Sequence, residues 1–230
     1  MAGFLDIVFP PSCVACARVL PGDGFFCPAC EEEVEPLPHP RCGLCAEPGD
    51  FGPAGCPRCQ ARPPPFSRAF APYWHEGAIA RAIHLFKYED QPELARPLAA
   101  LVAKAAAGFL HDAPRRLCAL PLHRNRFKER RYDQASLLAS ELGRLTGLVH
   151  HRDALIRERE TRRQVGLDEK AREANVAGAF GAGPAVRGHA FLLVDDVFTT
   201  GATARAASQA LLDAGATGVQ VLTVARAFSG

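Results

Sequence analysis

The stretch that most constrains the fold of this chain is residues 191–203, FLLVDDVFTTGAT. Its first four residues are apolar, which is typical of a strand buried on both faces of a parallel sheet. Two carboxylates, Asp195 and Asp196, follow where that strand should emerge, and a small, hydroxyl-rich turn then leads into an alanine-rich helix. The segment therefore predicts a strand, an acidic edge, a tight turn and a helix, in that order, within an α/β domain.

The turn in this segment has the chemistry of a phosphate site. Free N–H groups at a helix start, together with threonine hydroxyls, can wrap a phosphate, and Gly201 allows a close approach or a positive φ. The adjacent carboxylates can bind sugar hydroxyls or a hydrated Mg²⁺. An ordinary strand, turn and helix is the alternative, but the order of acids, hydroxyls and glycine favours a site for a sugar phosphate.

The same stretch resembles the phosphoribosyl pyrophosphate (PRPP) motif of type I phosphoribosyltransferases. The resemblance implies that the acidic pair binds the ribose 2′- and 3′-hydroxyls and that the TTGAT turn binds the 5′-phosphate. The positions that match the motif one by one are Asp195, Asp196, Thr199, Thr200, Gly201, Ala202 and Thr203.

Eight of the nine cysteines lie within the first 59 residues, as four CxxC pairs. Two such pairs about ten residues apart are a structural zinc pattern, and four thiolates close a tetrahedral site. We expect sequential pairing around one or two structural Zn²⁺ ions, with a cross-braced pairing as the open alternative. Disulfides and a redox CxxC are competing interpretations, but the chain has no evident secretion signal and no thioredoxin-like βαβ pattern. The pairs are Cys13/Cys16, Cys27/Cys30, Cys42/Cys45 and Cys56/Cys59.

The composition of the chain changes near residue 62. Residues 1–65 are rich in Pro and Gly and hold four Lys/Arg against eight Asp/Glu. We expect a double zinc-ribbon module over residues 1–62, with most of its folding free energy supplied by metal, and a second domain over residues 63–230. Residues 60–65, QARPPP, are typical of a stiff linker.

Positive charge is concentrated in residues 115–163, which hold thirteen Lys/Arg against six Asp/Glu, although the whole chain has a net charge of only +2. This segment suits a polyanionic partner, and the acidic N-terminal part does not. No apolar run approaches the ~18 residues of a membrane span. The apolar run at residues 4–9 is too short for the hydrophobic core of a signal peptide, and no basic residues precede it. We therefore expect a cytoplasmic protein without membrane insertion.

Residues 63–230 alternate between strand and helix patterns, which predicts a parallel sheet of four or five strands flanked by helices. Pro72 places the first strand at a sheet edge, and Asp133 is the expected cap of a helix that Gly147 ends. The expected strands lie near residues 66–75, 117–122, 149, 191–197 and 219–226. The expected helices cover residues 76–88, 92–110 and 134–146, and one follows the 199–203 turn.

Two basic segments are further candidates for the site. Residues 123–135, HRNRFKERRYDQA, follow a strand at the sheet edge that binds ligands and can neutralise a pyrophosphate. Residues 157–180 are expected to form an arginine-rich loop and a short helix, which either closes over a charged substrate or stays solvated. On residue type alone, Lys87 is expected on a solvated surface and His84 as a partly buried structural histidine.

The motifs taken together resemble the ComF family of competence-associated, phosphoribosyltransferase-like proteins. The resemblance covers the four CxxC pairs, HLFKY at 84–88, PLHRxRxxERxxxQA at 121–135, TxxQxGLxxxxRxxNVxGAF at 161–180 and VDDVxTTGAT. It implies a type I phosphoribosyltransferase fold behind the zinc ribbons, and a role in natural transformation that handles incoming single-stranded DNA in the cytoplasm. The site residues that it implies are Lys87, Arg124, Arg130, Gln134, Arg162, Gln164 and Asn175.

Two positions depart from the family pattern. Arg131-Tyr132-Asp133 stand where the family usually has Gly-Phe-Asn, which keeps an aromatic residue but loses a flexible glycine. Phe198 stands where a smaller apolar residue is usual, and it can reshape the acceptor side of the site.

The sequence supports an enzyme or a binding module. In the enzyme, Mg²⁺ and the acidic pair orient PRPP, the turn holds the 5′-phosphate, and Lys87, Arg124 and Arg130 neutralise pyrophosphate while an acceptor attacks C1. In the binding module, the same cradle and the 115–163 segment hold single-stranded DNA or a nucleotide without turnover, with Tyr132 and Phe127 stacking on bases. Phosphoribosyl transfer in nucleotide salvage is a further alternative. The expected partners are PRPP or another sugar phosphate, single-stranded DNA, and a DNA-uptake helicase or recombination mediator.

Overall fold

The computed structural model describes residues 11–22, 24–123, 125, 127–128, 131–159 and 174–228. Throughout these ranges, every helix is too short or too polar to cross a membrane. The short apolar segment at residues 4–9 lies outside the described residues.

A parallel sheet of six strands forms the centre of the molecule, in the order β1-β8-β7-β3-β4 with β2 also paired to β8. The two central strands, β7 (Ala190–Phe198) and β8 (Gly218–Arg226), pair along their full lengths. Both are almost continuous apolar runs, as expected of strands that are covered on both faces. The predicted parallel sheet is confirmed. The other strands are β1 (Arg68–Phe70), β2 (Tyr73–Trp74), β3 (Arg116–Ala119) and β4 (Val149–His150).

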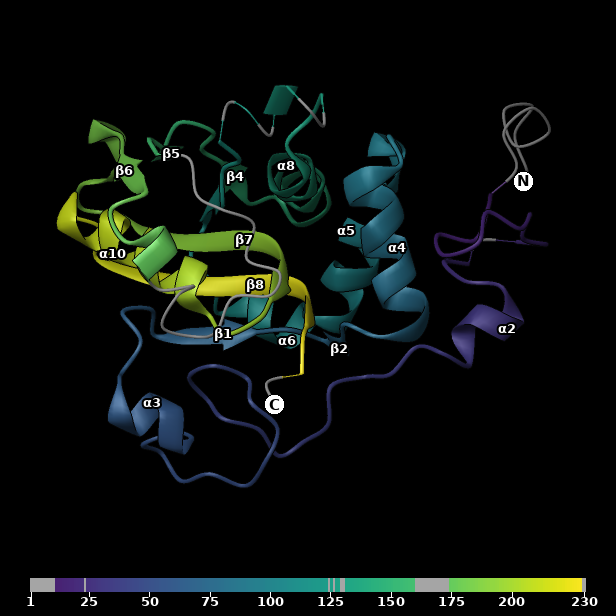
Figure 1. The fold of residues 1–230 in the computed structure, drawn as a ribbon, viewed down its shortest axis with the longest axis horizontal. Coiled ribbons are helices and arrows are strands. Elements are labelled where there is room, and N and C mark those ends of the chain that lie inside the picture. Colours follow the sequence, from purple (N-terminus) through teal and green to yellow (C-terminus); the bar gives the residue numbers. More distant parts are fainter. Residues whose placement is uncertain are drawn as a thin grey trace.

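Helices cover the sheet on two faces (Figure 1). The helices α4 (Gly77–Tyr88), α5 (Ala95–Ala105) and α8 (Gln134–Thr146) share one buried core with the sheet, and α10 (Ala202–Asp213) shares another. The helices α4 and α8 have nearly the predicted bounds, and α10 begins within the 199–203 turn, close to where a helix was expected. Asp133 caps α8 as predicted, because its Oδ1 accepts the Ser136 N–H at 2.9 Å.

The single helix predicted over residues 92–110 is wrong, because the chain forms three short pieces there. They are a 3₁₀ turn η1 (Pro92–Leu94), α5, and α6 (Ala107–His111). The backbone leaves the helical region at Ala106, where φ is −100° and ψ is 14°. Gly108 lowers the helix propensity close to the break, and the turn buries Ala106 and Phe109.

Alternation along β7 separates the two cores. Val194 belongs to the core under α4, α5 and α8, whereas Leu193 belongs to the core under α10. Since successive side chains of a strand point to opposite faces, Asp195 should point to the face covered by α10 and Asp196 to the face covered by α4. The two carboxylates therefore lie on opposite faces at the carboxyl edge of the sheet.

A small antiparallel pair, β5 (Leu155–Arg157) and β6 (Phe180–Ala182), lies outside the main sheet. Nothing in the sequence pattern predicted it. It holds the two ends of the segment expected as an arginine-rich loop, of which residues 160–173 lie outside the described part of the chain. A second 3₁₀ turn, η2 (Pro184–Val186), then leads into β7.

The cysteine-rich part forms two ribbons built on one plan, and a shift of 29 residues carries the first four cysteines onto the second four. In both ribbons an alanine after the first CxxC has a positive φ, 58° at Ala17 and 61° at Ala46. In both, a proline after the third cysteine starts a short helix, α2 (Pro28–Glu31) and α3 (Pro57–Ala61).

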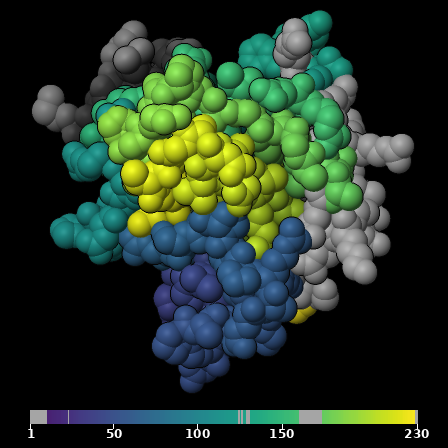
Figure 2. Space-filling view, turned by 90° about the vertical axis from the view of Figure 1, so that its left-hand side faces the viewer, coloured from purple at the N-terminus to yellow at the C-terminus, as the bar shows by residue number. Residues whose placement is uncertain are grey.

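The two ribbons lie apart and join different cores. The first ribbon lies beside α4 and shares its core, whereas the second lies below β1 and shares the α10 core (Figure 1). In Figure 2 the blue residues of this part form a lobe that projects from the yellow and green body. The domain boundary at residue 62 stays a prediction.

Candidate functional site

A cavity of about 1130 Å³ opens at the carboxyl edge of the sheet. This is the edge where open α/β sheets bind their ligands. The walls come from the end of β7, the turn before α10, the polar face of α4 and the segment after β3. The predicted site residues that line it are Lys87, Asp195, Asp196, Thr199, Gly201 and Thr203.

The turn before α10 has the shape expected of a phosphate cradle. Gly201 precedes the helix with φ 81° and ψ 2°, which confirms the positive φ that the sequence allowed. A Cβ at Gly201 would lie 2.7 Å from the Phe198 ring, so only glycine fits there. The Thr200 hydroxyl accepts the Ala202 N–H at 3.4 Å, and Thr199 and Thr203 line the cavity. Ala202 lines a smaller neighbouring cavity.

The two aspartates at the edge have different surroundings. Asp196 Oδ1 lies 2.7 Å from Lys87 Nζ, and the two side chains are only 10% and 20% exposed. The Asp195 Oδ1 accepts the Asp196 N–H at 2.8 Å. Burial and the nearby charge of Asp196 raise the pKa of Asp195 to about 8. The raised pKa favours the protonated form of Asp195 at neutral pH.

Lys87 points into the site, which corrects its expected place on a solvated surface. Two contacts hold the end of α4 that carries it. The Tyr132 hydroxyl donates to the Phe86 carbonyl at 2.6 Å, and the Gln134 side-chain amide donates to the Lys87 carbonyl at 3.4 Å. Gln134 is 1% exposed and is not among the described residues that line the cavity. Its direct contact with substrate stays a prediction.

Of the other predicted site residues, the structure describes only Asn175, which is not among the described residues that line the cavity. The Asn175 carbonyl accepts a hydrogen bond from the Arg159 guanidinium at 3.0 Å, and Arg159 also binds the Ala177 carbonyl at 2.7 Å. Arg159 thereby joins the two ends of the segment around residues 160–173. The predicted site residues that lie outside the described part of the chain are Arg124, Arg130, Arg162 and Gln164.

Among the cavity residues that were not predicted as part of the site are His75, His84, Tyr88 and Arg157. His84 is exposed, so its expected burial is wrong, and its ring centroid lies 5.0 Å from that of Tyr88. These two residues are four positions apart on α4, a spacing that places them on one helix face. Burial and then the Lys87 charge lower the pKa of His75.

Tyr132 does not lie open for stacking on a base. Its ring centroid is 6.0 Å from that of Phe86, and its hydroxyl is bonded to the α4 backbone. Phe127, by contrast, is 49% exposed. Of the two aromatic residues proposed for stacking, only Phe127 is thus mainly on the surface.

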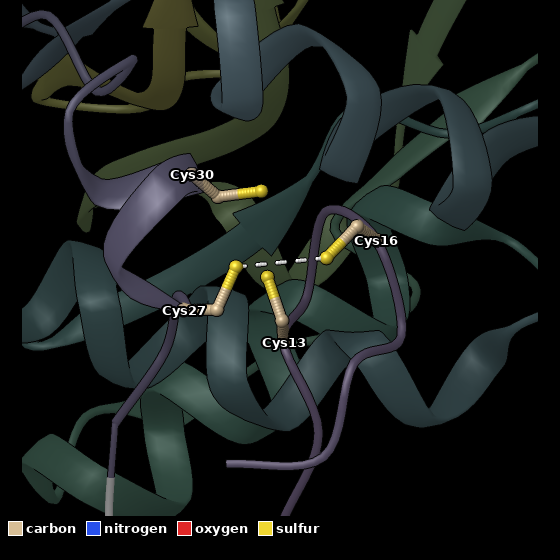
Figure 3. A group of neighbouring side chains, drawn as sticks. All are labelled: Cys13, Cys16, Cys27 and Cys30. Atoms are coloured by element: carbon tan, nitrogen blue, oxygen red, sulfur yellow. Dashed lines mark hydrogen bonds between the residues drawn. The ribbon is translucent and has the colours of Figure 1, made fainter.

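Each cysteine tetrad brings four sulfur atoms within 4.8 Å of one another, in the sequential pairing that we expected. Figure 3 shows the first, in which the Cys16 and Cys27 sulfurs are 3.7 Å apart. The Cys45 and Cys56 sulfurs of the second are 3.6 Å apart. Four ligands on a tetrahedral Zn²⁺ lie about 3.8 Å from one another, since Zn–S is about 2.3 Å. The spacing fits structural zinc and is too long for disulfides.

Backbone amides favour the thiolate of Cys42. The Cys56 N–H points at the Cys42 sulfur, with an N···S distance of 3.2 Å. Burial opposes ionisation of Cys42, but the amides of Cys45, Cys56 and Leu44 outweigh it and lower the pKa of this thiol to about 7. Thiolates are the form that binds Zn²⁺. With four sulfur ligands the site is closed, so the zinc it would hold is structural.

Comparison with known proteins extends these findings. The double zinc ribbon domain family matches residues 4–61. The chain is 30% identical over 220 residues to the DNA utilization protein YhgH of Escherichia coli strain K12, which covers 93% of this chain and 89% of that protein. It is 29% identical over 211 residues to Competence protein F of Haemophilus influenzae, with 88% and 90% covered.

The chain belongs to the ComF family. This ComF-family chain has a parallel sheet flanked by helices, as the predicted type I phosphoribosyltransferase fold requires, with two zinc ribbons in front. A solved structure of the glutamine PRPP amidotransferase from B. subtilis, complexed with ADP and GMP, is 21% identical and gives a TM-score of 0.40. The match covers 60% of the ComF-family chain and 30% of that chain, which is too distant to assign chemistry.

Proposed function

We propose that this ComF-family protein binds PRPP with Mg²⁺ in the cavity and transfers the phosphoribosyl group to an acceptor, in the service of DNA utilization. The observation that carries the proposal is the meeting of the Gly201 turn, the acidic pair and Lys87 in one cavity. The names of the relatives, DNA utilization protein and Competence protein F, support the biological role.

The turn before α10 would bind the 5′-phosphate. The first N–H groups of α10 have no partner inside the helix, and they carry the positive end of the helix dipole. Thr199 and Thr203 add hydroxyl donors on the cavity wall. A dianionic phosphate at this place would accept hydrogen bonds from these donors.

The acidic pair is suited to the ribose hydroxyls and to Mg²⁺. Asp195 and Asp196 present oxygen atoms, the ligands that Mg²⁺ takes in phosphate sites. Bound there with PRPP, the cation would supply neutralisation of the pyrophosphate charge. The position of the carboxylates on opposite faces of β7 lets the two side chains approach the sugar from two sides.

Lys87 would supply the positive charge for the pyrophosphate leaving group. In the ligand-free protein it neutralises Asp196 at 2.7 Å. Its flexible side chain can turn from the carboxylate to an added phosphate without movement of α4. Arg124 and Arg130 are proposed for the same task on the basis of the family motif, and Arg162, Gln164 and Asn175 as further PRPP contacts.

A thermal-shift experiment tests the proposal. PRPP with Mg²⁺ should raise the Tm of the wild type, and Asp195→Asn/Asp196→Asn should abolish the rise. The control is Asp112→Asn, which alters a 69% exposed carboxylate shortly before β3 begins and should leave the rise intact. An equal Tm rise in the double variant would contradict the proposed site. Release of pyrophosphate in a screen of acceptors would distinguish turnover from binding.

A second function, the binding of single-stranded DNA, is favoured by the surface beside the cavity mouth. Tyr88 is 54% exposed and Phe127 49% exposed. The Arg131 side chain, 82% exposed, lies 3.9 Å from Asp90 and so joins this region to the end of α4. Exposed aromatic rings among cations are the pattern that binds single strands.

The test is the affinity of an oligonucleotide across a range of salt concentrations. Tyr88→Ala/Phe127→Ala should weaken binding, and the affinity should fall as salt rises. The control is Phe228→Ala, which removes a 73% exposed ring that contacts Trp74 instead. An affinity that stays flat with salt, or an equal loss in the control, would contradict this assignment.

A further inference from the structure

Arg226, the last residue of β8, is a charged side chain with no exposed surface. Its guanidinium has partners from two parts of the molecule. Nη1 donates to the Cys45 carbonyl at 2.6 Å, and Nη2 pairs with the Glu47 carboxylate. The guanidinium carbon also lies 5.1 Å from the centre of the Phe198 ring. A buried guanidinium depends strongly on such partners, because removing one leaves an uncompensated charge.

The partners on one side belong to the second ribbon. Cys45 is a ligand in the second tetrad, and Glu47 follows it by two residues. The Cys42 N–H donates to the Glu47 carbonyl at 2.7 Å, so Glu47 is part of the same knuckle. The position of both acceptors therefore depends on how the second tetrad is closed.

The partner on the other side is the floor of the phosphate turn. Phe198 is the last residue of β7 and lies opposite Arg226 in the sheet. Its ring also makes an edge contact with Phe66, with centroids 6.2 Å apart. A Cβ at Gly201 would lie 2.7 Å from Cζ of the same ring, which leaves no room for a side chain there. The position of the Phe198 ring thus limits how closely the turn can approach the end of β7.

We propose that Arg226 is a positioning residue that couples the second zinc ribbon to the phosphate turn. A closed tetrad fixes the Cys45 carbonyl and Glu47, these fix the guanidinium, and the guanidinium fixes the Phe198 ring beneath Gly201. Loss of metal from this ribbon therefore weakens phosphate binding in a cavity to which the ribbon contributes no lining residue among those described. The inference rests on the proposed binding of PRPP.

Arg41 provides a matched control from the same ribbon. Its Nη1 donates to the Ala71 carbonyl at 3.0 Å, and its guanidinium carbon lies 4.4 Å from the centre of the Phe70 ring. Arg41 therefore joins the second ribbon to β1 and the residue that follows it, as Arg226 joins the ribbon to β8. The difference is that the described contacts of Arg41 do not include Phe198 or the turn.

The experiment measures the Kd for PRPP with Mg²⁺ and the zinc content of the full-length protein. Arg226→Met and Glu47→Gln should each weaken PRPP binding about tenfold, which corresponds to roughly 1.4 kcal/mol. Arg41→Met should lower the Tm of the free protein but leave the Kd unchanged. Cys59→Ser, which opens the second tetrad, should remove one zinc equivalent and weaken binding as much as Arg226→Met.

The outcomes separate this inference from the proposed function. A wild-type protein that does not bind PRPP would overturn both. Binding that persists unchanged in folded Arg226→Met, or an equal loss in Arg41→Met, would overturn the coupling alone. If Arg226→Met does not fold, Glu47→Gln decides the question, because it keeps the guanidinium and removes only the charge of its partner.

Discussion

Lys87 and Asp196 form an ion pair at the carboxyl edge of the sheet, with 2.7 Å between Nζ and Oδ1. The lysine comes from α4 and the aspartate from β7, so the pair joins a helix to the central strand. Because little of either side chain is exposed, the ion pair is not an ordinary surface contact. It holds both side chains in place when no ligand is bound. Both partners are also proposed to contact PRPP, which makes the pair the element that a ligand must rearrange.

Lys87→Met should lower the free energy of unfolding by about 1–3 kcal/mol, because it leaves a largely buried carboxylate without its cation. Lys87→Met/Asp196→Asn should recover part of this loss, since the orphaned charge is also removed. Urea denaturation of the four proteins in the cycle measures the coupling. Strictly additive effects would show that the ion pair has no influence on stability.

The pKa of Asp195 predicts how stability depends on pH. This carboxyl ionises near pH 4 in an unfolded chain, but burial raises its pKa to about 8 in the folded protein. The folded state therefore binds more protons between these values, and the contribution of Asp195 to stability declines as pH rises from about 4 to about 8. Asp195→Asn lacks this decline, so its stability relative to the wild type should grow over this range. A pH-independent difference would contradict the raised pKa.

Binding of PRPP with Mg²⁺ should release a proton at neutral pH. The raised pKa of Asp195 favours its protonated form before the ligand binds, whereas it would serve the cation and the ribose as a carboxylate. Titration calorimetry at pH 7 in buffers with different ionisation enthalpies measures this release. Asp195→Asn should show a smaller release, or none. An equal release from the wild type and the variant would assign the proton to another group.

Arg131 occupies a backbone conformation that favours glycine. Its φ is 63°, and its N–H donates to the Phe127 carbonyl at 2.7 Å. A non-glycine residue in the left-handed region is disfavoured by roughly 1 kcal/mol. Arg131→Gly should therefore be more stable than Arg131→Ala by about that amount in thermal or urea unfolding. Equal stability of the two variants would show that the backbone there is relaxed.

The protein should contain two zinc equivalents. Cys16→Ser and Cys59→Ser each open a different tetrad, so each variant should retain one equivalent in metal analysis. The two ribbons join different cores, and we expect the losses to be independent. A variant that loses both ions at once would indicate that the ribbons fold as one unit.

The sequence predicted the central strands because burial on both faces leaves an unbroken apolar run, as in residues 191–194. It predicted sequential pairing as the simplest arrangement of the two tetrads, because each CxxC pair directs two thiolates to one centre, and the structure decides between this and the cross-braced alternative. The Gly201 turn could be predicted for a similar reason, since only glycine tolerates its φ and the ring beneath it. In each case the controlling contacts are local in the sequence.

The rest depends on contacts between distant segments. Lys87 was expected on the surface because the pattern of its helix gives no information about Asp196, which lies more than one hundred residues later. The burial of Arg226 could not be foreseen, because its partners Cys45 and Glu47 come from the other end of the chain. The break at Ala106 lies in an alanine-rich stretch that predicts an unbroken helix. The helix ends there because the turn buries Ala106 and Phe109 in the core.

A crystal structure of the protein with PRPP and Mg²⁺ tests the central claim most directly. In that structure the 5′-phosphate should lie against the backbone amides of residues 199–203. The ribose hydroxyls should contact Asp195 and Asp196, and Lys87 should be turned toward the pyrophosphate. PRPP bound elsewhere on the molecule, or a cavity that stays free of it at saturating concentration with the Lys87–Asp196 pair intact, would contradict the account.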